Sequence, residues 1–491
     1  MILSDKQKKK AQMLESTKRL INLLLVLGCI ALEIGIFSYH WITHFQYSVV
    51  EPLRHFWFKG HLLEISIYGV ILLLFSSMYG GMRLGYLKNS EIVFSQMFAT
   101  FLAEIIIYGE LSLMAFQLFH PYYFIQMIFE QFVVVLVYIP IANRVYRRIF
   151  PPRRLLLIYG WKNPDDLKNK FETRKDKYII ADRISADDGY EAVVNRINED
   201  LSEGKCNAVV IGDVSEMQRK PLIKYCYGNS IRFYLLPKIN DVILTGAEEL
   251  HVFDSPILLS REYSLTIEER VVKRAIDLIC SIILIVLTSP FMLLTAIAVK
   301  AYDRGPVLYR QTRVTRGNRE FTIYKFRSMK VDAESDGVAR LSSKGDTRVT
   351  PVGKFIRKCR LDELPQLFNI LKGDMSFIGP RPERPEIIKQ YTEIMPEFEF
   401  RTKVKAGLAG FAQVYGKYNT TPYDKLKLDL IYIEKYSILL DLKLMLLTLK
   451  VLLWPDSTEG VEKEQITALK NANVNPDSNG EKLKKITKTD E

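Results

Sequence analysis

The chain has 491 residues and a formal net charge of +12 at pH 7, with 48% hydrophobic and 25% charged residues. This length indicates more than one domain, and the positive charge favours anionic partners such as membrane headgroups, phosphates or nucleic acid. The five cysteines are scattered and form no CxxC pair, so neither a disulfide framework nor a zinc site is indicated, and a reducing compartment fits.

Four apolar runs of membrane length occupy the first third of the chain, at residues 20–40, 62–79, 92–119 and 122–141. Each approaches the roughly 20 residues that a helix needs to cross a bilayer. The first run lacks a small-residue cleavage site and similar runs follow it, which predicts a membrane helix and not a signal peptide. We therefore expect a bundle of four transmembrane helices within residues 20–150.

Basic residues flank this bundle at both ends. Residues 1–19 are polar and include six lysines or arginines, and five arginines lie within residues 144–154. The positive-inside rule places both segments in the cytoplasm. This pattern predicts a multi-pass protein of the cell (inner, cytoplasmic) membrane, with the rest of the chain on the cytoplasmic side.

Residues 151–260 are typical of a soluble α/β domain. Continuous apolar runs predict buried parallel strands at residues 155–159, 178–180, 208–211 and 231–236. Helical patterns alternate with these runs, which indicates a Rossmann-like sheet. A dinucleotide fingerprint is missing after the first run. No Asp-x-Asp pair occurs in this segment, so a structural, regulatory or dimerising role is favoured over metal-dependent glycosyl transfer.

A second apolar block of membrane length covers residues 278–299. Ser289 and Pro290 stand at its centre, and an internal proline breaks or kinks a helix. Basic residues flank the block on both sides, and a full span would place the charged remainder of the chain outside the cell. We predict a re-entrant helix over residues 275–301 that enters and leaves by one face, with an ordinary fifth span as the alternative.

Two adjacent acids, Asp362 and Glu363, organise the C-terminal half of the chain. Pro365 cannot donate a backbone hydrogen bond and so fits the first turn of a helix, and apolar residues recur after it at helical spacing. The two carboxylates are therefore predicted near a helix N-terminus, where the helix dipole favours anions. A pair of capping carboxylates is the simpler interpretation of such a motif.

The residues around the acids favour a binding site over a cap. Basic side chains precede and follow the pair, namely Lys354, Arg357, Lys358, Arg360, Arg381 and Arg384. Such a set of cations suits a phosphorylated substrate with a metal ion. No histidine occurs after His251, so histidine is excluded as the base in this half, which leaves carboxylates, lysine, tyrosine, serine or Cys359.

Four further motifs, KFRSM at 325–329, DELPQL at 362–367, GPRP at 379–382 and GLAGFAQV at 407–414, follow the Ser-Pro break in order. Together they resemble the catalytic domain of the monotopic bacterial phosphoglycosyl transferases, which initiate exopolysaccharide, capsule and O-antigen synthesis. The resemblance covers residues 270–455, and the preceding bundle and α/β domain resemble the large members of that family. The sequence departs from the family pattern at Leu408, Ala409 and Phe411, where isoleucine, threonine and tryptophan are expected, which bears on sugar preference.

The resemblance implies an α-rich monotopic catalytic domain, residues 261–455, that contains the re-entrant helix. It implies that Asp362 takes a sugar phosphate from a UDP-sugar, releases UMP and passes the sugar phosphate to polyprenyl (undecaprenyl) phosphate. Glu363 is then a ligand of Mg²⁺, a hard cation that neutralises the pyrophosphate. The candidate substrate-binding residues are Lys325, Arg327, Arg348, Arg357, Arg381, Pro382 and Arg384. Glucose or galactose is the expected sugar.

The end of the chain contains two further segments. Residues 434–454 are rich in leucine with charges between them, which favours a helix lying at the membrane interface over a sixth span. Residues 456–491 are polar and are predicted to be a disordered tail. The expected partners are a UDP-sugar, polyprenyl phosphate, the lipid bilayer and a second copy in a homodimer, without nucleic acid.

Two other function classes stay open from the sequence. A non-enzymatic membrane scaffold or sensor requires the acid pair and its arginines to be accidental. A processive glycosyltransferase is disfavoured by the lack of an Asp-x-Asp pair in the α/β domain. The products distinguish the three, because phosphosugar transfer releases UMP, glycosyl transfer releases UDP and a scaffold releases neither.

Overall fold

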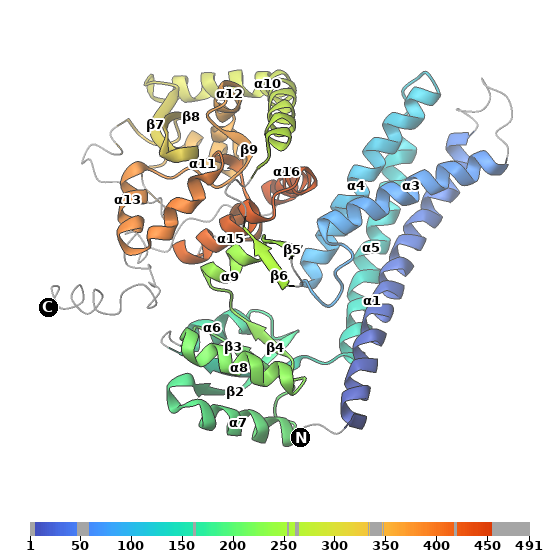
Figure 1. The fold of residues 1–491 in the computed structure, drawn as a ribbon. Coiled ribbons are helices and arrows are strands. Elements are labelled where there is room, and N and C mark those ends of the chain that lie inside the picture. The colour runs from blue at the N-terminus through green and yellow to red at the C-terminus, as the bar shows by residue number, and fades with distance from the viewer. Residues whose placement is uncertain are drawn as a thin grey trace. The chain divides into compact units, whose positions relative to one another are not determined.

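The computed structural model describes residues 5–46, 58–160, 164–252, 255–260, 265–331, 333, 346, 348–416 and 420–453. The chain divides into two compact units, Met1–Leu236 and Pro237–Glu491 (Figure 1). The first unit holds a helical bundle and an α/β domain, and the second holds the acidic dyad formed by Asp362 and Glu363. The predicted tail at 456–491 lies outside the described residues.

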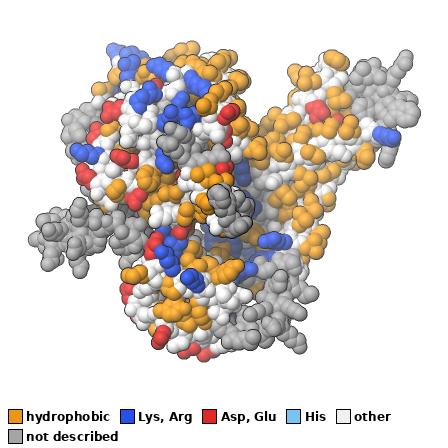
Figure 2. All heavy atoms as spheres, in the orientation of Figure 1, with side chains coloured by type: hydrophobic (Ala, Val, Ile, Leu, Met, Phe, Trp, Pro, Cys, Tyr) orange, Lys and Arg blue, Asp and Glu red, His pale blue; other side chains and the backbone are white. Residues whose placement is uncertain are grey.

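The bundle consists of α1 (Asp5–His40), which continues into a short π-helical turn η1 (Trp41–Phe45), α3 (Phe58–Tyr79), α4 (Asn89–Met114) and α5 (Tyr122–Ile149). All four helices are long and apolar enough to cross a membrane, and hydrophobic side chains cover much of the bundle surface in Figure 2. The four predicted membrane-length helices are therefore present. Most of the basic segment 1–19 belongs to α1, because lysine, glutamine and glutamate are good helix formers.

A layer of buried polar side chains joins the four helices of the bundle. The Glu33 carboxylate of α1 accepts hydrogen bonds from Gln96 at 2.8 Å and from Thr100 at 2.5 Å, both on α4. Gln131 of α5 donates a hydrogen bond of 2.7 Å to the hydroxyl of Tyr68 on α3. Because apolar surroundings offer these groups few other partners, the layer helps to specify how the helices pack.

The α/β domain contains one parallel sheet with strand order β2-β1-β3-β4. Its elements are β1 (Arg153–Tyr159), α6 (Pro164–Glu172), β2 (Tyr178–Ser185), η2 (Ala186–Asp188), α7 (Tyr190–Ser202), β3 (Ala208–Ile211), α8 (Glu216–Gly228) and β4 (Phe233–Leu235). Leu156 and Ile158 pack on one side of the sheet, and Leu155 and Leu157 pack on the other, as the alternation of side chains along a strand requires. The predicted parallel α/β sheet is confirmed.

The α/β domain contacts the loop between α3 and α4. Arg174 donates a hydrogen bond of 2.6 Å to the backbone carbonyl of Tyr86, and the Lys177 ammonium lies 4.3 Å from the centre of the Tyr86 ring. Arg147 at the end of α5 forms an ion pair of 3.2 Å with Asp176. The α3–α4 loop and the end of α5 therefore lie at the same end of the bundle, as four antiparallel helices require.

The second unit begins earlier than the sequence predicts. Its first helix, α9 (Ile239–Leu244), buries Val242 in the same hydrophobic core as Leu426. The division of the chain therefore falls after Leu236 and not at the predicted boundary near residue 260. Local patterns do not reveal this division, because α9 packs against a helix that lies far away in the sequence.

The rest of the second unit is rich in helices and has three sheets of two strands each within the described chain. Its elements are β5 (Glu248–Val252), β6 (Ser255–Leu259), α10 (Ile267–Asp303), β7 (Leu308–Val314), η3 (Arg316–Asn318), β8 (Glu320–Phe326), α11 (Pro351–Lys358), η4 (Leu361–Glu363), α12 (Gln366–Lys372), β9 (Ser376–Ile378), α13 (Pro385–Ile394), η5 (Pro396–Lys403), β10 (Gly407–Ala409), α14 (Phe411–Tyr415), α15 (Pro422–Glu434) and α16 (Ile438–Leu453). Ile370, Met375 and Leu444 are completely buried at the centre of its core.

Helix α10 passes through Pro290 without ending, and Figure 1 shows it bent into two arms. Thr266 caps its first turn and accepts a hydrogen bond of 3.3 Å from the backbone N–H of Glu269. Near the bend, the Ser289 hydroxyl donates a hydrogen bond of 2.8 Å to the carbonyl of Val286. Pro290 lacks the N–H that would otherwise bind that carbonyl, so the serine satisfies the group that the proline leaves free.

Within the leucine-rich segment at 434–454, one helix, α16, covers Ile438–Leu453 and follows a break after α15. It has 16 residues, fewer than the roughly 20 that a membrane span needs. Leu444 is buried in the core of the second unit, whereas Leu439, Leu442 and Leu449 are exposed. One side of α16 thus packs against the core. The exposed leucines on α16 agree with the predicted position of this helix at the membrane interface.

Candidate active site

The acidic dyad lies in the short 3₁₀ turn η4, between α11 and α12. Arg360, just before the turn, has a left-handed backbone conformation with a φ of 57°. Helix α12 begins only at Gln366, with Pro365 as its N-cap residue. The two acids therefore lie just before the start of α12, near a helix N-terminus as predicted.

Glu363 is surrounded by basic side chains from three parts of the chain. Its Oε1 atom accepts a hydrogen bond of 2.8 Å from Lys325 and one of 3.1 Å from Arg381. Its Oε2 atom lies 3.8 Å from a guanidinium nitrogen of Arg360. Lys325 extends from β8 and Arg381 from the loop after β9. The fold thus brings two of the predicted substrate-binding residues to one carboxylate.

The two acids of the dyad have opposite electrostatic environments. Burial, followed by the negative charge of Glu363, raises the pKa of Asp362 to about 6. Burial also acts to raise the pKa of Glu363, but its basic neighbours outweigh that effect and hold it well below its usual range. Asp362 is 8% exposed, and within the described chain no side chain donates a hydrogen bond to its carboxylate. A buried, poorly stabilised carboxylate suits a reactive nucleophile better than a cap.

Three other predicted substrate-binding residues lie on elements that adjoin the dyad. Arg357 on α11 donates a hydrogen bond of 2.8 Å to the hydroxyl of Ser328, and its charge acts to lower the pKa of Asp362. Pro382 lines a pocket next to Arg381. Arg384 is the N-cap residue of α13. Of these three, Arg357 is the one whose charge acts on the Asp362 carboxylate.

Arg327 and Arg348 are paired with carboxylates outside the dyad. Arg327 binds both carboxylate oxygens of Asp303 at the end of α10, with one hydrogen bond of 2.8 Å. Arg348 binds both carboxylate oxygens of Asp346, at 2.9 and 2.7 Å. Because arginine recognises a carboxylate through such paired bonds, each guanidinium group is held by a carboxylate outside the dyad. Their contact with the substrate stays a prediction.

The glycines near the dyad allow two backbone segments to approach closely. Strand β9 pairs in parallel with β10. A Cβ atom on Gly379 would lie 2.3 Å from the carbonyl oxygen of Lys405, and one on Gly407 would lie 2.1 Å from the backbone nitrogen of Gly379. A side chain does not fit at either position unless the backbone moves. The loop that carries Arg381 therefore leaves the strand pair along a path that these glycines define.

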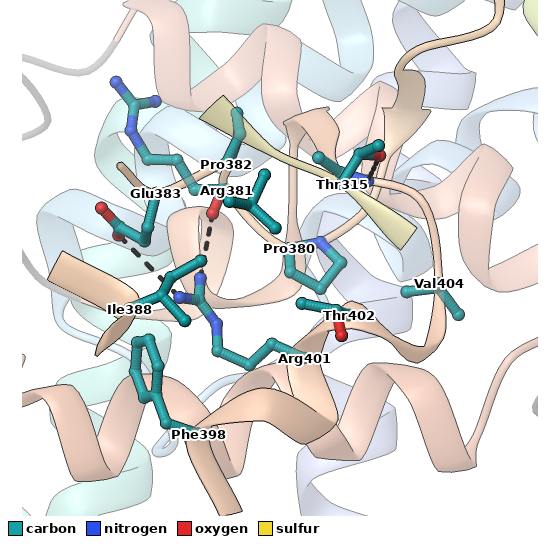
Figure 3. A pocket seen from close by; sticks show the side chains of 12 residues that line it. Thr315, Pro380, Arg381, Pro382, Glu383, Ile388, Phe398, Arg401, Thr402 and Val404 are labelled. Atoms are coloured by element: carbon teal, nitrogen blue, oxygen red, sulfur yellow. Dashed lines mark hydrogen bonds and ion pairs between the residues drawn. The ribbon is translucent and has the colours of Figure 1, made fainter. Parts of the chain in front are cut away.

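A small pocket lies beside this loop, and the residues that line it include Thr315, Pro380, Arg381, Pro382, Glu383 and Arg401 (Figure 3). Arg401 donates a hydrogen bond of 3.0 Å to the backbone carbonyl of Arg381, and another of its nitrogens lies 4.0 Å from the Glu383 carboxylate. A third nitrogen donates a hydrogen bond of 2.7 Å to Asp429. The guanidinium of Arg401 therefore joins helix α15 to the loop beside the dyad.

Sequence analysis missed both Arg401 and Asp429. Asp429 lies three residues after the fully buried Leu426 and one before Leu430, which is also buried. An acid within the buried side of an amphipathic helix needs a charged or hydrogen-bonding partner. The position of Asp429 among apolar residues could therefore have indicated a buried ion pair, but it does not identify the basic partner.

The chemistry of the dyad fits Mg²⁺ better than a transition metal. Both donors are carboxylates, and within the described ranges there is no group of three or more His, Cys, Asp or Glu residues that could hold a metal ion. Mg²⁺ usually binds through one or two carboxylates, retained waters and substrate phosphates. Glu363, the predicted metal ligand, would supply one such carboxylate beside the substrate phosphates.

A carboxylate dyad among basic side chains, in one compact unit with a membrane-length helix, defines a membrane-associated enzyme for phosphorylated substrates. The family model of the bacterial sugar transferases matches residues 268–455. The chain is 36% identical to the UDP-N-acetylgalactosamine-undecaprenyl-phosphate N-acetylgalactosaminephosphotransferase of Aeromonas hydrophila over 71% of this chain and 78% of that protein. The protein belongs to the bacterial sugar transferase family, which confirms the resemblance predicted from the motifs.

Two further relatives match shorter parts of their own lengths. The UDP-glucose:undecaprenyl-phosphate glucose-1-phosphate transferase of Klebsiella pneumoniae is 36% identical over 62% of this chain and 60% of its own. The undecaprenyl-phosphate galactose phosphotransferase of Salmonella typhimurium is 34% identical over 45% of this chain and 49% of its own. The names of the three relatives specify three different sugars and the same lipid acceptor, undecaprenyl phosphate.

Proposed function

We propose that this protein transfers a sugar-1-phosphate from a UDP-sugar to undecaprenyl phosphate, releasing UMP and forming an undecaprenyl-diphosphate sugar. This reaction is the first membrane step of exopolysaccharide, capsule or O-antigen synthesis. The observation that carries the proposal is the dyad: Asp362 is buried without a hydrogen-bond donor in the described chain, beside a Glu363 that Lys325 and Arg381 hold ionised. The relatives supply the chemistry of donor and acceptor.

The reaction takes place in two displacements at one phosphorus. A carboxylate oxygen of Asp362 attacks the phosphorus that bears the sugar, the bond from that phosphorus to the bridging oxygen breaks, and UMP leaves with the bridging oxygen. An oxygen of undecaprenyl phosphate then attacks the same phosphorus, and the Asp362 carboxylate leaves. Carboxylate nucleophiles that form acyl phosphates are established in other phosphoryl transfers.

The basic residues stabilise the charge that develops on the phosphoryl oxygens. Lys325 and Arg381 place two positive charges beside Glu363. Donors that are already in position before the reaction lower the barrier to phosphoryl transfer most. Mg²⁺, when bound by Glu363 and the donor phosphates, would neutralise the pyrophosphate charge that repels the attacking carboxylate. We propose glucose or galactose as the sugar.

The attachments of α10 support a re-entrant helix. Near its start, Asp277 accepts hydrogen bonds of 3.0 Å from the Ser376 hydroxyl and the Phe377 backbone. At its end, Asp303 binds Arg327. A straight helix rises about 1.5 Å per residue, so these two acids would lie about 39 Å apart, beyond the ~30 Å thickness of the hydrocarbon core. Because both acids bind one catalytic unit, we infer that α10 enters and leaves the membrane on one side.

We propose that this side of the membrane faces the cytoplasm. We also propose that the protein lies in the inner membrane of the cell. The four helices of the bundle return the chain to its starting side, and the arginines at the end of α5 favour the cytoplasm. UDP-sugars are made there, so the donor reaches the dyad without crossing the bilayer. The homodimer stays a prediction.

The discriminating experiment measures which nucleotide is released. Purified protein is incubated with undecaprenyl phosphate, Mg²⁺ and a panel of UDP-sugars, and UMP and UDP are separated by chromatography. UMP release that depends on undecaprenyl phosphate supports phosphosugar transfer. UDP release would indicate a glycosyltransferase, and release of neither nucleotide from any donor would indicate a scaffold or sensor.

A further inference from the structure

We propose that Arg401 and Asp429 are positioning residues for the phosphosugar transfer, acting by holding the backbone at Arg381 so that its side chain reaches Glu363. The inference rests on the proposed function, because it assigns a role within that site. Arg401 lies on η5 and Asp429 on α15, and neither touches the carboxylates of the dyad directly in any described contact.

The pair of Arg401 and Asp429 is almost completely buried. The two side chains are 7% and 2% exposed, and their closest atoms are 2.7 Å apart. The guanidinium also lies 4.7 Å from the centre of the Phe398 ring. A buried ion pair seldom stabilises a fold more than well-packed apolar side chains of similar volume. The charges are therefore better explained by what the guanidinium binds than by stability.

The guanidinium connects α15 to the dyad through one backbone group. Arg401 donates a hydrogen bond of 3.0 Å to the carbonyl of Arg381. The side chain of Arg381 then donates a hydrogen bond of 3.1 Å to Glu363. That side chain is 42% exposed, so packing restrains it only in part. The position of its backbone consequently decides how well the guanidinium of Arg381 reaches the dyad.

Two neighbouring carbonyls of the same loop are held by backbone groups. The carbonyl of Pro380 accepts a hydrogen bond of 2.9 Å from the N–H of Gly407, and that of Glu383 accepts one of 3.1 Å from the N–H of Val314. Of these three carbonyls, the one at Arg381 is held by a side chain. A substitution can therefore release this point of the loop while the backbone bonds on both sides remain.

The role predicts that the effect of the pair depends on Arg381. If the loop moves, the guanidinium of Arg381 withdraws from Glu363, and its contribution to the reaction is lost. In a protein without the Arg381 side chain, substitution of Arg401 and Asp429 should then change activity very little. A general loss of folded protein would instead lower activity to the same extent whether or not Arg381 is present.

The main test replaces the ion pair by apolar side chains of similar size, in the double variant Arg401→Met, Asp429→Leu. We expect its melting temperature to stay close to that of the wild type. We expect kcat/KM for UMP release to fall roughly 10- to 100-fold, as when supporting residues of other sites are changed. In an Arg381→Ala background the double substitution should have an effect of less than about twofold, because the two changes act through one group.

The matched control is the buried pair of Lys273 and Asp441, which joins α10 to α16. These side chains are 10% and 7% exposed. Within the described chain they form hydrogen bonds with each other, with Tyr432 and with the carbonyl of Ile378, and not with residues 380–383. The variant Lys273→Met, Asp441→Leu reports the general cost of removing a buried pair in the same unit. We expect its effect on kcat/KM to be the same in the wild-type and Arg381→Ala backgrounds.

Several outcomes decide the question. If the main double variant keeps wild-type kcat/KM, or loses activity to the same extent in the Arg381→Ala background, the pair is only structural and the proposal is overturned. If that variant does not fold, Asp429→Asn keeps the size of the side chain. It should lower kcat/KM in the wild-type background but by less than about twofold in the Arg381→Ala background, and equal losses in both backgrounds overturn the proposal. Absence of UMP release from the wild type would instead refute the proposed function.

Discussion

The hydroxyl of Ser289 lies 2.8 Å from the carbonyl oxygen of Val286. That carbonyl precedes Pro290 by four residues and so loses its usual helical partner. An unpaired carbonyl in lipid costs several kcal/mol. The serine supplies the missing hydrogen bond from within the helix. The pair of residues thus explains how a helix of 37 residues can bend at Pro290 without leaving this carbonyl unpaired.

The first prediction concerns the side on which the two ends of α10 lie. Single cysteines at Ala275 and Ala301, both at exposed positions, are introduced into a chain without its native cysteines. We expect both to resist a membrane-impermeant thiol reagent in intact cells and both to react once the membrane is opened, because both ends attach to one cytoplasmic unit. Labelling of the Ala301 position alone in intact cells would mean that α10 spans the membrane and that the catalytic unit faces outward.

The second prediction concerns the dyad. Asp362→Asn should reduce UMP release by more than about 1,000-fold, because the amide keeps the shape of the side chain and loses its nucleophilic charge. Glu363→Gln should reduce activity and weaken its dependence on Mg²⁺ together. Membrane fractionation shows whether insertion is intact. Near-normal UMP release from correctly inserted Asp362→Asn protein would remove Asp362 as the nucleophile.

The third prediction concerns the effect of Asp362 on the stability of the folded protein. The pKa of Asp362 is raised in the folded protein to about 6 from a usual value of 3.8. The folded state thus binds this proton more tightly than the unfolded state, and stability is lost as pH rises from about 4 to about 6. The loss amounts to about 3 kcal/mol. Asp362→Asn removes this loss, so the variant should melt at a higher temperature than the wild type at pH 7 and at a similar one at pH 4.

The measurement for the third prediction is thermal unfolding of purified protein in detergent at both pH values. Asp165→Asn is a suitable control, because Asp165 is 58% exposed in a surface ion pair, and such pairs contribute little. A wild type and an Asp362→Asn variant that melt together at pH 7 would contradict the electrostatic account of the dyad.

The fourth prediction concerns the metal ion. Excess chelator should abolish UMP release, and added Mg²⁺ should restore it, because a carboxylate and donor phosphates form an oxygen-rich site. Zn²⁺ should restore much less, since no histidine occurs after His251 and zinc prefers nitrogen and sulfur ligands. Activity is measured at a fixed ionic strength. Full activity in excess chelator would argue against any metal at Glu363.

The fifth prediction assigns different roles to Lys325 and Arg327, the two basic residues between positions 325 and 329. Lys325→Met should lower kcat by roughly 100-fold with little change in melting temperature, because Arg381 still pairs with Glu363. Arg327→Met should leave Asp303 without its paired partner and lower the free energy of unfolding by about 3 kcal/mol, with a smaller effect on kcat of the folded fraction. Kinetics and thermal unfolding of both variants check this division, and the opposite pattern would assign the substrate contact to Arg327.

Much of the architecture could be predicted from local patterns. The apolar run at 208–211 is strand β3 with those bounds, and the run at 62–79 falls within α3. Such patterns are readable because burial and hydrogen bonding within one helix or strand depend on neighbours in the sequence. The acid pair and the Ser-Pro break were identified for the same reason, since two adjacent carboxylates, or a proline beside a hydroxyl, keep their chemistry in any fold.

The sequence by itself therefore determined the helices of membrane length, the α/β sheet and the acid pair of Asp362 and Glu363. Tertiary structure alone decided that Lys325 binds Glu363 whereas Arg327 binds Asp303, and that the partner of Asp429 is Arg401. The sequence shows which residues are charged but does not give the distances between their side chains. Ion-pair energies depend on distance and on burial, and both are set only when segments far apart in the chain pack together.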